Sequence, residues 1–421
     1  MKQRTYLCID MKSFYASVEC AERGLNPFEV NLVVADPTRS SNTICLAISP
    51  KMKSLGVKNR CRLGDIPKGM DFIVAMPRMG LYEDYCAEIY SIYLDYMDKM
   101  DVYQYSIDEA FIDATDYLKL YEKTPVQFAK MLLDEIASRL KIPATVGIGT
   151  NMYLAKIALD ITAKRTKDHI GYLDEKLFKE QLWDYTPLTD FWGIGKGISD
   201  RLAKYGIKTM RGIAEAPEEL LYRIFGIDAE LMIDHANGIE PCTLEDIHNY
   251  KSKSKSISNS QVLFKDTPLD EARIIISEMI LEASQQLKKR KMITSKVGIG
   301  VVYSRGYIPS TGEVLNVHAA TNAFSILNEY GLKAFDATTV KGAPIRKLCV
   351  TMPDIADESA EGYDLFCDYE KIAKENKAEK AVLSIKEKFG KNAMLRAIDF
   401  KDGATQRERN KMIGGHNGGE E

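Results

Sequence analysis

The sequence has 421 residues, of which 45% are hydrophobic and 28% are charged, and its formal net charge is −3. This composition is typical of a globular protein, and the length fits roughly two to four domains. The apolar runs are shorter than a membrane span, residues 1–10 lack a signal-peptide pattern, and the eight cysteines include no Cys-x-x-Cys pair. We therefore expect a cytoplasmic protein without a membrane partner, a zinc site or a disulfide framework.

The first 165 residues alternate between patterns typical of strands and patterns typical of helices. They predict strands at 4–10, 31–35, 43–48, 72–75 and 145–149, and helices at 13–23, 51–55, 82–100, 125–140 and 152–163. A β-hairpin after the long helix at 82–100 prevents a purely parallel sheet. We expect a mixed sheet with helices on one face, in an α+β protein of several domains.

The hairpin is predicted around Tyr105–Asp113, where apolar residues flank two adjacent carboxylates, Asp108 and Glu109. At a turn both side chains can converge on one ligand, and a cation would offset the cost of unpaired carboxylates in apolar surroundings. An isolated Asp-Glu pair is more often a solvated turn. Asp10 ends the first strand and adds a third carboxylate at the same sheet edge. Such a set suits two Mg²⁺ ions in phosphoryl transfer, although spacing alone also fits three unrelated surface acids.

Beyond residue 166 the strand patterns stop, and residues 177–233 are predicted to form several short helices. Residues 236–256 have the composition of a solvated linker. Strand and helix patterns return between Ile257 and Met352 and predict a second, smaller α+β domain. The residues after it contain one clear helix pattern, at 378–389, and end in a stretch that is too polar to fold alone.

Two features favour a nucleic-acid partner. Residues 251–350 carry 15 Lys and Arg against 8 Asp and Glu, a balance of +7, although a solvated basic face has the same composition. The run Phe191-Trp-Gly-Ile-Gly-Lys-Gly197 precedes a predicted helix. Glycines before a helix expose backbone N–H groups to a phosphate, so the run is typical of a helix-hairpin-helix grip on DNA, whereas most lone Gly-x-Gly sequences are simple turns.

Two stretches resemble a known family. Ile9–Glu19 and Tyr105–Phe111 are similar to the two palm signatures of Y-family DNA polymerases, the translesion group, and the order of elements resembles that family over about residues 1–350. Within the family, the sequence resembles the catalytic subunit of bacterial DNA polymerase V and its Gram-positive relatives. The resemblance implies a right-hand polymerase with a palm (1–25 and 76–165), fingers (26–75), a helical thumb (166–235), a linker (236–256), an α+β little finger (257–353) and a C-terminal tail (354–421).

The resemblance also implies roles for individual residues of the palm. Asp10, Asp108 and Glu109 would bind the metal ions, together with the backbone carbonyl of Met11. Tyr15 matches the steric gate that excludes a ribose 2′-hydroxyl, and Phe14 would line the nucleotide beside it. Packing in the helix core is the alternative for both aromatic residues.

Lysines and a serine would bind the incoming nucleotide. The fingers segment 47–57 resembles the one that holds the triphosphate, where Ser49 and Lys53 would contact the nucleotide. Many members have Tyr and Arg where this sequence has Pro50 and Lys53, and Lys lacks the guanidinium fork. Lys164 matches a palm lysine that reaches the triphosphate. By comparison, Lys156 is interpreted as structural, and Lys12 stands where some members have a further acid.

DNA and clamp contacts follow from the same resemblance. The residues expected to contact DNA phosphates are Gly193, Gly195, Lys196, Gly197, Lys251, Lys253, Lys255, Arg290, Lys291 and Arg305. Tyr363, Leu365 and Phe366 lie where relatives carry a sliding-clamp peptide, although Gly362 replaces its usual Gln. The alternative is a tail segment that packs on its own domain.

The predicted function is template-directed DNA polymerisation with two Mg²⁺ ions, in low-fidelity translesion synthesis during DNA repair and SOS mutagenesis, without proofreading. The expected partners of a monomeric enzyme are primer-template DNA, a dNTP, a sliding clamp and an accessory or recombinase-type activating subunit. Pro50 and Lys53 leave open a catalytically degenerate DNA-binding repair scaffold. A nucleotide cyclase shares the palm carboxylates but needs neither the helix-hairpin-helix nor a basic second domain.

Overall fold

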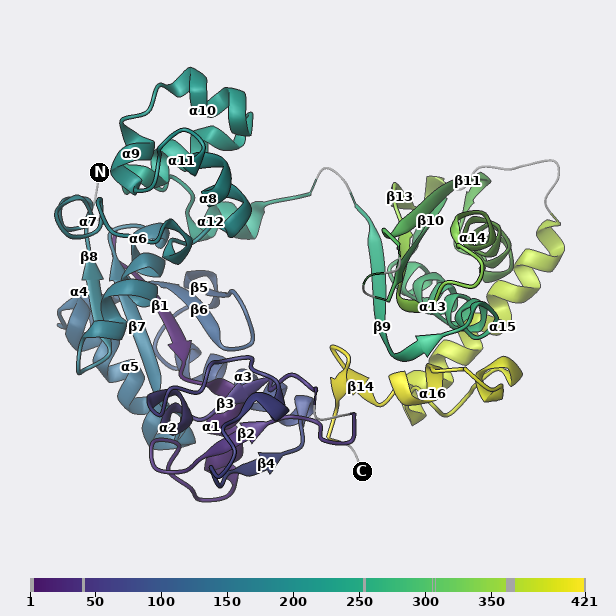
Figure 1. Cartoon of the computed structure of the whole chain (residues 1–421), viewed down its shortest axis with the longest axis horizontal. Coiled ribbons are helices and arrows are strands. Elements are labelled where there is room, and N and C mark those ends of the chain that lie inside the picture. Colours follow the sequence, from purple (N-terminus) through teal and green to yellow (C-terminus); the bar gives the residue numbers. More distant parts are fainter. Residues whose placement is uncertain are drawn as a thin grey trace. The chain divides into compact units, whose positions relative to one another are not determined.

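The structure is a computed structural model that describes residues 4–39, 42–252, 255–304, 306, 308–360 and 368–419. The chain divides into two compact units, one up to Tyr250 and one from Lys251 onward (Figure 1). Within the described ranges, no helix is both long and apolar enough to cross a bilayer.

A five-stranded sheet forms the centre of the first unit. Its strands, in spatial order, are β5 (Val102–Gln104), β6 (Glu109–Asp113), β1 (Tyr6–Met11), β7 (Ala144–Gly149) and β8 (Ile170–Leu173). All neighbours are antiparallel except β7 and β8, so the predicted mixed sheet is confirmed. The prediction that strands stop after residue 166 is wrong. The four-residue strand β8 is stabilised by its pairing with β7, which a local pattern does not reveal.

The helices of the first unit begin and end as follows: α1 (Phe14–Glu22), α2 (Pro50–Ser54), α3 (Met79–Leu94), α4 (Tyr117–Leu120), α5 (Pro125–Leu140), α6 (Met152–Ile157), α7 (Glu175–Gln181), α8 (Lys196–Ala203), α9 (Met210–Ala214), α10 (Glu218–Phe225), α11 (Asp228–Ala236) and α12 (Leu244–Asn249). The helix predicted at 152–163 is irregular, because α6 is followed by a π-helical turn at Ala158–Thr162 and a 3-10 turn at Ala163–Arg165.

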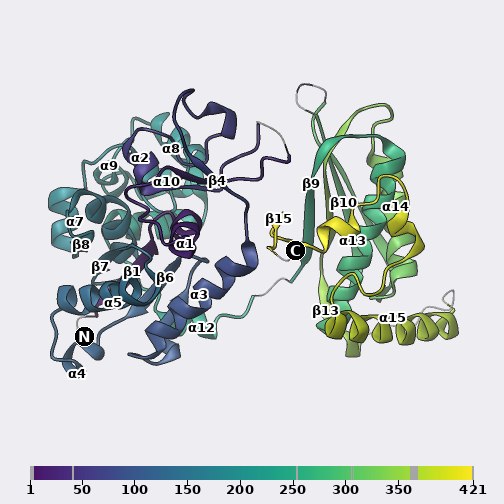
Figure 2. The same ribbon diagram turned by 90° about the horizontal axis from the view of Figure 1, so that it is seen from below.

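The central sheet is covered on both faces, so the prediction of helices on one face is wrong. α6 lies so close to β7 that a Cβ on Gly147 would be 2.1 Å from the Ala155 carbonyl oxygen. The opposite face presents Ile9 and Ile148, which are also fully buried. α5 contacts β7 and packs beside α3, and Figure 2 shows both helices on the same side of the strands.

A small sheet and a helical cluster complete the first unit. The small sheet contains β2 (Leu32–Val34), β3 (Ala47–Ile48) and β4 (Ile73–Ala75). The strand predicted at 43–48 is shorter than expected, since only an isolated bridge between Ile44 and Arg62 precedes β3. The helices α7 to α11 share one apolar core with α6. Part of the predicted linker is folded, because α12 buries Leu244 against the central sheet.

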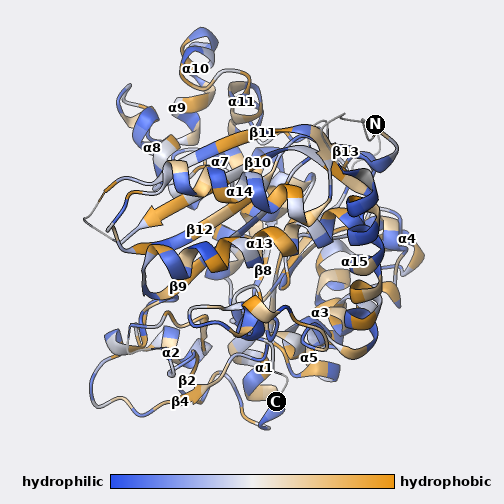
Figure 3. Ribbon diagram, turned by 90° about the vertical axis from the view of Figure 1, so that its right-hand side faces the viewer, coloured by the Kyte–Doolittle hydropathy of each residue, from blue (hydrophilic) through white to orange (hydrophobic). Residues whose placement is uncertain are grey.

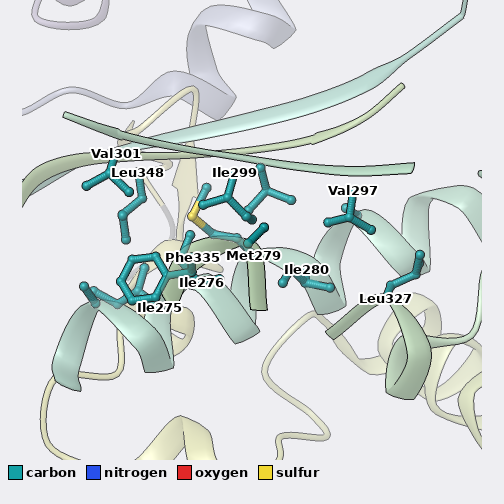
Figure 4. Close-up of a cluster of buried hydrophobic side chains, with 14 of the residues drawn as sticks. Ile275, Ile276, Met279, Ile280, Val297, Ile299, Val301, Leu327, Phe335 and Leu348 are labelled. Carbon is teal, nitrogen blue, oxygen red and sulfur yellow. The ribbon is translucent and has the colours of Figure 1, made fainter. Parts of the chain in front are cut away.

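The second unit is an antiparallel sheet with two long helices on one face. The strands run in the order β11 (Thr311–Thr321), β10 (Met292–Tyr303), β12 (Ile345–Met352) and β9 (Ile257–Thr267), and β13 (Ile355–Asp357) also pairs with β10. The helices are α13 (Leu269–Lys289) and α14 (Phe324–Thr338). Figure 3 shows hydrophobic residues along β10 and β12 and alternating polar and apolar residues on α13. Ile276, Met279, Ile299 and Phe335 meet in the resulting core (Figure 4).

The C-terminal tail folds against α13. It contains α15 (Tyr369–Phe389), α16 (Gln406–Arg409) and the short strands β14 (Met412–Ile413) and β15 (His416–Asn417). The buried carboxylate of Glu278 accepts hydrogen bonds from the backbone N–H and the hydroxyl of Thr405, at 3.0 Å each. Arg409 forms an ion pair with Glu282. The polar tail therefore gains its fold from contacts with its neighbour.

Candidate active site

Three carboxylates meet at one edge of the central sheet. Asp10 on β1 lies directly opposite Glu109 on β6. Asp108 is in the turn before β6, and its carbonyl oxygen accepts a hydrogen bond of 3.0 Å from the Met11 N–H. The Ser106 hydroxyl donates to the Asp108 carboxylate at 2.8 Å and fixes the turn. The structure thus brings together the three acids that the sequence singled out.

The three acids are partly buried beside one another. Burial raises the pKa of Asp10, the neighbouring Asp108 and Glu109 add to the rise, and the resulting pKa is about 7. A carboxyl with this pKa is only partly ionised near neutral pH. A bound cation would neutralise the cluster and restore the ionised form.

Lys156 on α6 supplies one positive charge inside the fold. Its ammonium group donates to the carboxylates of Glu109 and Asp160, the latter at 3.3 Å. Burial by itself would lower the pKa of Lys156, but the neighbouring Cys8, Asp160 and Glu109 raise it. From the sequence, Lys156 is interpreted as structural, and Asp160 is not among the predicted site residues. The i, i+4 spacing of 156, 160 and 164 was the available signal, because it places all three on one helix face.

The donor set suits a hard divalent cation, although it is not pre-arranged around one. In the described part of the chain, no group of three or more His, Cys, Asp or Glu side chains is positioned to hold a metal ion. The Glu109 carboxylate is bonded to Lys156 instead. Carboxylate oxygens are nevertheless the ligands that Mg²⁺ prefers, and a cation would offset both the burial of Asp10 and the neighbouring negative charges that raise its pKa. The residues therefore fit a divalent metal.

Tyr15 is held by a chain of contacts beside the acids. Its ring stacks on Tyr82 of α3, with a centroid distance of 4.5 Å and an interplanar angle of 17°. The Tyr82 hydroxyl donates to buried Glu19 at 2.8 Å, and Arg78 donates two further hydrogen bonds to the same carboxylate. Phe14 is 3% exposed and packs in the core, which was the alternative considered for it. The steric-gate role of Tyr15 stays a prediction.

Three lysines approach the same edge from different segments. Burial lowers the pKa of Lys12 to about 8. The charge of Asp10 opposes this shift, and the charge of Lys53 adds to it. Burial also lowers the pKa of Lys53. The charge of Asp10 raises this pKa, and the charge of Lys164 lowers it. Lys164 is exposed and lies 3.9 Å from Asp160. Lys12 is not among the predicted nucleotide-binding residues, because the resemblance places it only where some members have a further acid.

The Ser49 side chain caps the N-terminus of α2. It is buried at the N-cap of α2, where its hydroxyl accepts a hydrogen bond from the Met52 N–H at 3.4 Å and donates to the Val30 carbonyl at 2.7 Å. A hydroxyl engaged in this way orients α2 and, through it, Lys53. Its predicted contact with the nucleotide stays a prediction.

Comparisons with known proteins decide the family. The impB/mucB/samB family model matches residues 9–160, and the model for that family's C-terminal domain matches residues 254–365. The chain is 32% identical to DNA polymerase IV 2 of Bacillus subtilis (strain 168) over 99% of both chains. It is 30% identical to the putative UV-damage repair protein UvrX of the same strain over 98% of both. The structure matches the Y-family DNA polymerase chimera Dbh-Dpo4(243-245)-Dbh with a TM-score of 0.64 and 20% identity, covering 84% of this chain and 99% of that chain.

The chain belongs to the Y family of DNA polymerases. It is a DNA-directed DNA polymerase of the translesion type, and its substrates are accordingly a DNA template and deoxynucleoside triphosphates. The predicted family, right-hand fold class and enzyme class are confirmed. Y-family polymerases generally use divalent metal ions.

The glycine run of this polymerase forms a tight turn before α8. Gly193 has a φ of +86°, a conformation that favours glycine, and Gly195 is the N-cap of α8. Lys196 and Gly197 form the exposed first turn of the helix. Leu202 and Ile207 are buried behind it. The geometry is that of a helix N-terminus open to a phosphate.

Two of the predicted basic residues of the second unit lie near the same acid. Lys255 and Lys291 both lie near Asp357 and help to lower its pKa, after the hydrogen bonds from Ser359. Lys251 and Arg290 are exposed. Some predicted contacts lie outside the described residues, namely Lys253, Arg305 and the clamp peptide Tyr363, Leu365 and Phe366.

Proposed function

We propose that this polymerase joins a dNTP to a primer 3′ end at the edge formed by Asp10, Asp108 and Glu109. The observation that supports it is the direct pairing of Asp10 with Glu109, with Asp108 in the adjoining turn. Two Mg²⁺ ions bound by these acids and by the Met11 carbonyl would lower the pKa of the primer hydroxyl and neutralise the leaving pyrophosphate. Low-fidelity extension without proofreading, in SOS mutagenesis, belongs to the same proposal.

The surrounding side chains would position the nucleotide. Lys53 and Lys164 would neutralise the triphosphate, with Lys12 beside them. Tyr15, held by Tyr82, would exclude a ribose 2′-hydroxyl. Ser49 would act through α2, and Phe14 would support the Tyr15 ring from the core.

The same proposal covers the domains and the partners of the polymerase. The five-stranded sheet would be the palm, the small sheet with α2 the fingers, α7 to α11 the thumb, and the sheet of the second unit the little finger. The turn before α8 and the basic residues of the second unit would bind DNA phosphates. A clamp contact through Tyr363, Leu365 and Phe366, an activating subunit and a cytoplasmic location remain part of the proposal.

Primer extension by the purified protein tests the proposal. Wild type, Asp108→Ala, Tyr15→Ala and the control Asp84→Ala, an exposed acid on α3, are compared with Mg²⁺, dNTPs and a primed template. We expect Asp108→Ala to lose at least about a thousandfold in rate, because one metal ligand is removed. Tyr15→Ala should accept ribonucleotides, and Asp84→Ala should match wild type. If wild type binds the primed template tightly but does not extend it, even with a clamp present, the repair-scaffold alternative holds.

A further inference from the structure

Two cysteines of the first unit face each other beside α2. Cys45 and Cys61 flank the antiparallel bridge between Ile44 and Arg62. The Cys45 N–H donates to the Cys61 carbonyl at 2.8 Å, and the Leu63 N–H donates to the Thr43 carbonyl at 2.9 Å. Residues next to an antiparallel bridge lie directly opposite each other and point to the same face. Cys45 and Cys61 are therefore cross-strand neighbours.

Their spacing suits a covalent link. Hydrogen-bonded partners on antiparallel strands have Cα atoms about 5.5 Å apart, which is within the roughly 4.4–6.8 Å that disulfides span. Both cysteines are free thiols. The two side chains also interact, since burial first and then Cys61 raise the pKa of Cys45 to about 12.

The two thiols differ in access to solvent. Cys45 is fully buried in the apolar cluster of the small sheet, whereas Cys61 is half-buried at its edge. A soluble oxidant therefore reaches Cys61 first. Cys45 is held next to it and is placed to resolve the oxidised sulfur.

We propose that Cys45 and Cys61 form a reversible disulfide when the protein meets a hydroperoxide. The Cys61 sulfur attacks the peroxide oxygen, the O–O bond breaks, and a sulfenic acid and water (or an alcohol) form. The Cys45 sulfur then attacks the Cys61 sulfur, the S–O bond breaks, and the sulfenic hydroxyl leaves as a second water with the Cys45 proton. The peroxide is reduced and two thiols are oxidised, and a cellular dithiol reverses the reaction by exchange. Transient, redox-sensing disulfides of this kind are the ones expected in reducing compartments.

The link would restrain the segment that holds the triphosphate in the proposed function. Residues 46–60 lie between the two cysteines and include α2 with Lys53. Arg60, next to Cys61, is close enough to Tyr15 to influence the pKa of its hydroxyl. Oxidation would tie both ends of this segment together and limit its adjustment to an incoming nucleotide. This regulatory consequence rests on the proposed function, whereas the disulfide itself does not.

Peptide mapping tests the disulfide without reference to activity. The full-length protein is treated with hydrogen peroxide, its remaining thiols are blocked with N-ethylmaleimide, and its peptides are identified by mass spectrometry. We expect a linked pair that contains Cys45 and Cys61 and has lost two hydrogen atoms, and we expect dithiothreitol to abolish it. Cys61→Ser should give no link, and Cys86→Ser, which changes another partly buried thiol, should give the wild-type link. Separate blocking of both cysteines, or overoxidation of Cys61 alone, would overturn the proposal.

Primer extension then tests the consequence. We expect oxidised wild type to lose about fivefold in kcat/KM for the dNTP, dithiothreitol to restore it, and Cys61→Ser to be insensitive to peroxide. A mapped disulfide with unchanged kcat/KM would overturn the regulatory role and leave the disulfide standing. If reduced wild type does not extend primers at all, the proposed function fails, while the peptide map still decides the disulfide.

Discussion

At the scale of single residues, the properties of the site depend on which charged side chains are buried together. The three acids and Tyr15 belong to two contiguous sequence signatures, so their positions could be predicted from the sequence. Lys12, Lys53, Lys156 and Asp160 come from separate segments and meet only in the folded chain. A local pattern carries no information on such convergence, so the sequence does not reveal Asp160 as a neighbour of the acids.

Asp10 makes stability depend on pH. Its pKa of about 7 is above the unfolded value near 3.8, so its contribution to stability is complete below pH 4 and is lost as the pH rises through 7. Asp10→Asn removes this loss. Without divalent ions, we expect the variant to exceed wild type in unfolding free energy by about 4 kcal/mol at pH 8, and by less at pH 5. Urea unfolding at both pH values measures the gap, and an equal gap at both would contradict the assignment.

Lys156 and Lys164 contact the same carboxylate from different environments. The side chain of Lys156 is 8% exposed and that of Lys164 is 69% exposed. We expect Lys156→Met to lower the unfolding free energy by about 2–3 kcal/mol, because it leaves two carboxylates without their buried partner. Lys164→Met should change it by less than about 0.5 kcal/mol, since exposed ion pairs contribute little. Denaturant unfolding compares the two variants, and similar losses in both would refute the distinction.

At the scale of elements, the close approach of α6 to β7 holds Lys156 against Glu109. Gly147→Ala would place a methyl group 2.1 Å from the Ala155 carbonyl oxygen, so α6 must move away. We expect a loss of more than about 3 kcal/mol in unfolding free energy, accompanied by slower primer extension. Gly197→Ala is the matched control, since a Cβ there meets nothing within 4 Å, and should change stability by less than about 1 kcal/mol. A tolerated Gly147→Ala would show that this packing is dispensable.

The elements that the sequence did not predict share one cause. Periodicity predicts most long helices and the strands of the central sheet other than β8, because each carries its own apolar pattern. β8, α12 and the π-helical turn after α6 are short and depend on distant partners. Gly171 on β8, for example, allows the backbone of Ala158 to approach, and a contact of this kind cannot be read from neighbouring residues.

At the scale of the whole molecule, the tail is part of the second unit. Two carboxylates on α13 bind polar groups of the tail. Glu278 accepts a hydrogen bond from the Thr405 hydroxyl, and Glu282 forms an ion pair with Arg409. Deletion of residues 368–421 would leave the buried Glu278 carboxylate without hydrogen bonds. We expect the melting temperature of the second unit to fall by at least about 5 °C in scanning calorimetry. Removal of only Glu420 and Glu421 is the control, and an unchanged transition in the longer deletion would show that the tail is an appendage.

The boundary between Tyr250 and Lys251 has a kinetic consequence. If each unit grips DNA by itself, then binding by one holds the other at a high effective concentration near the same duplex. Either grip can then loosen and rebind while the chain stays attached. The avidity of the pair, more than the strength of either contact, would set how long the polymerase remains on a primer end.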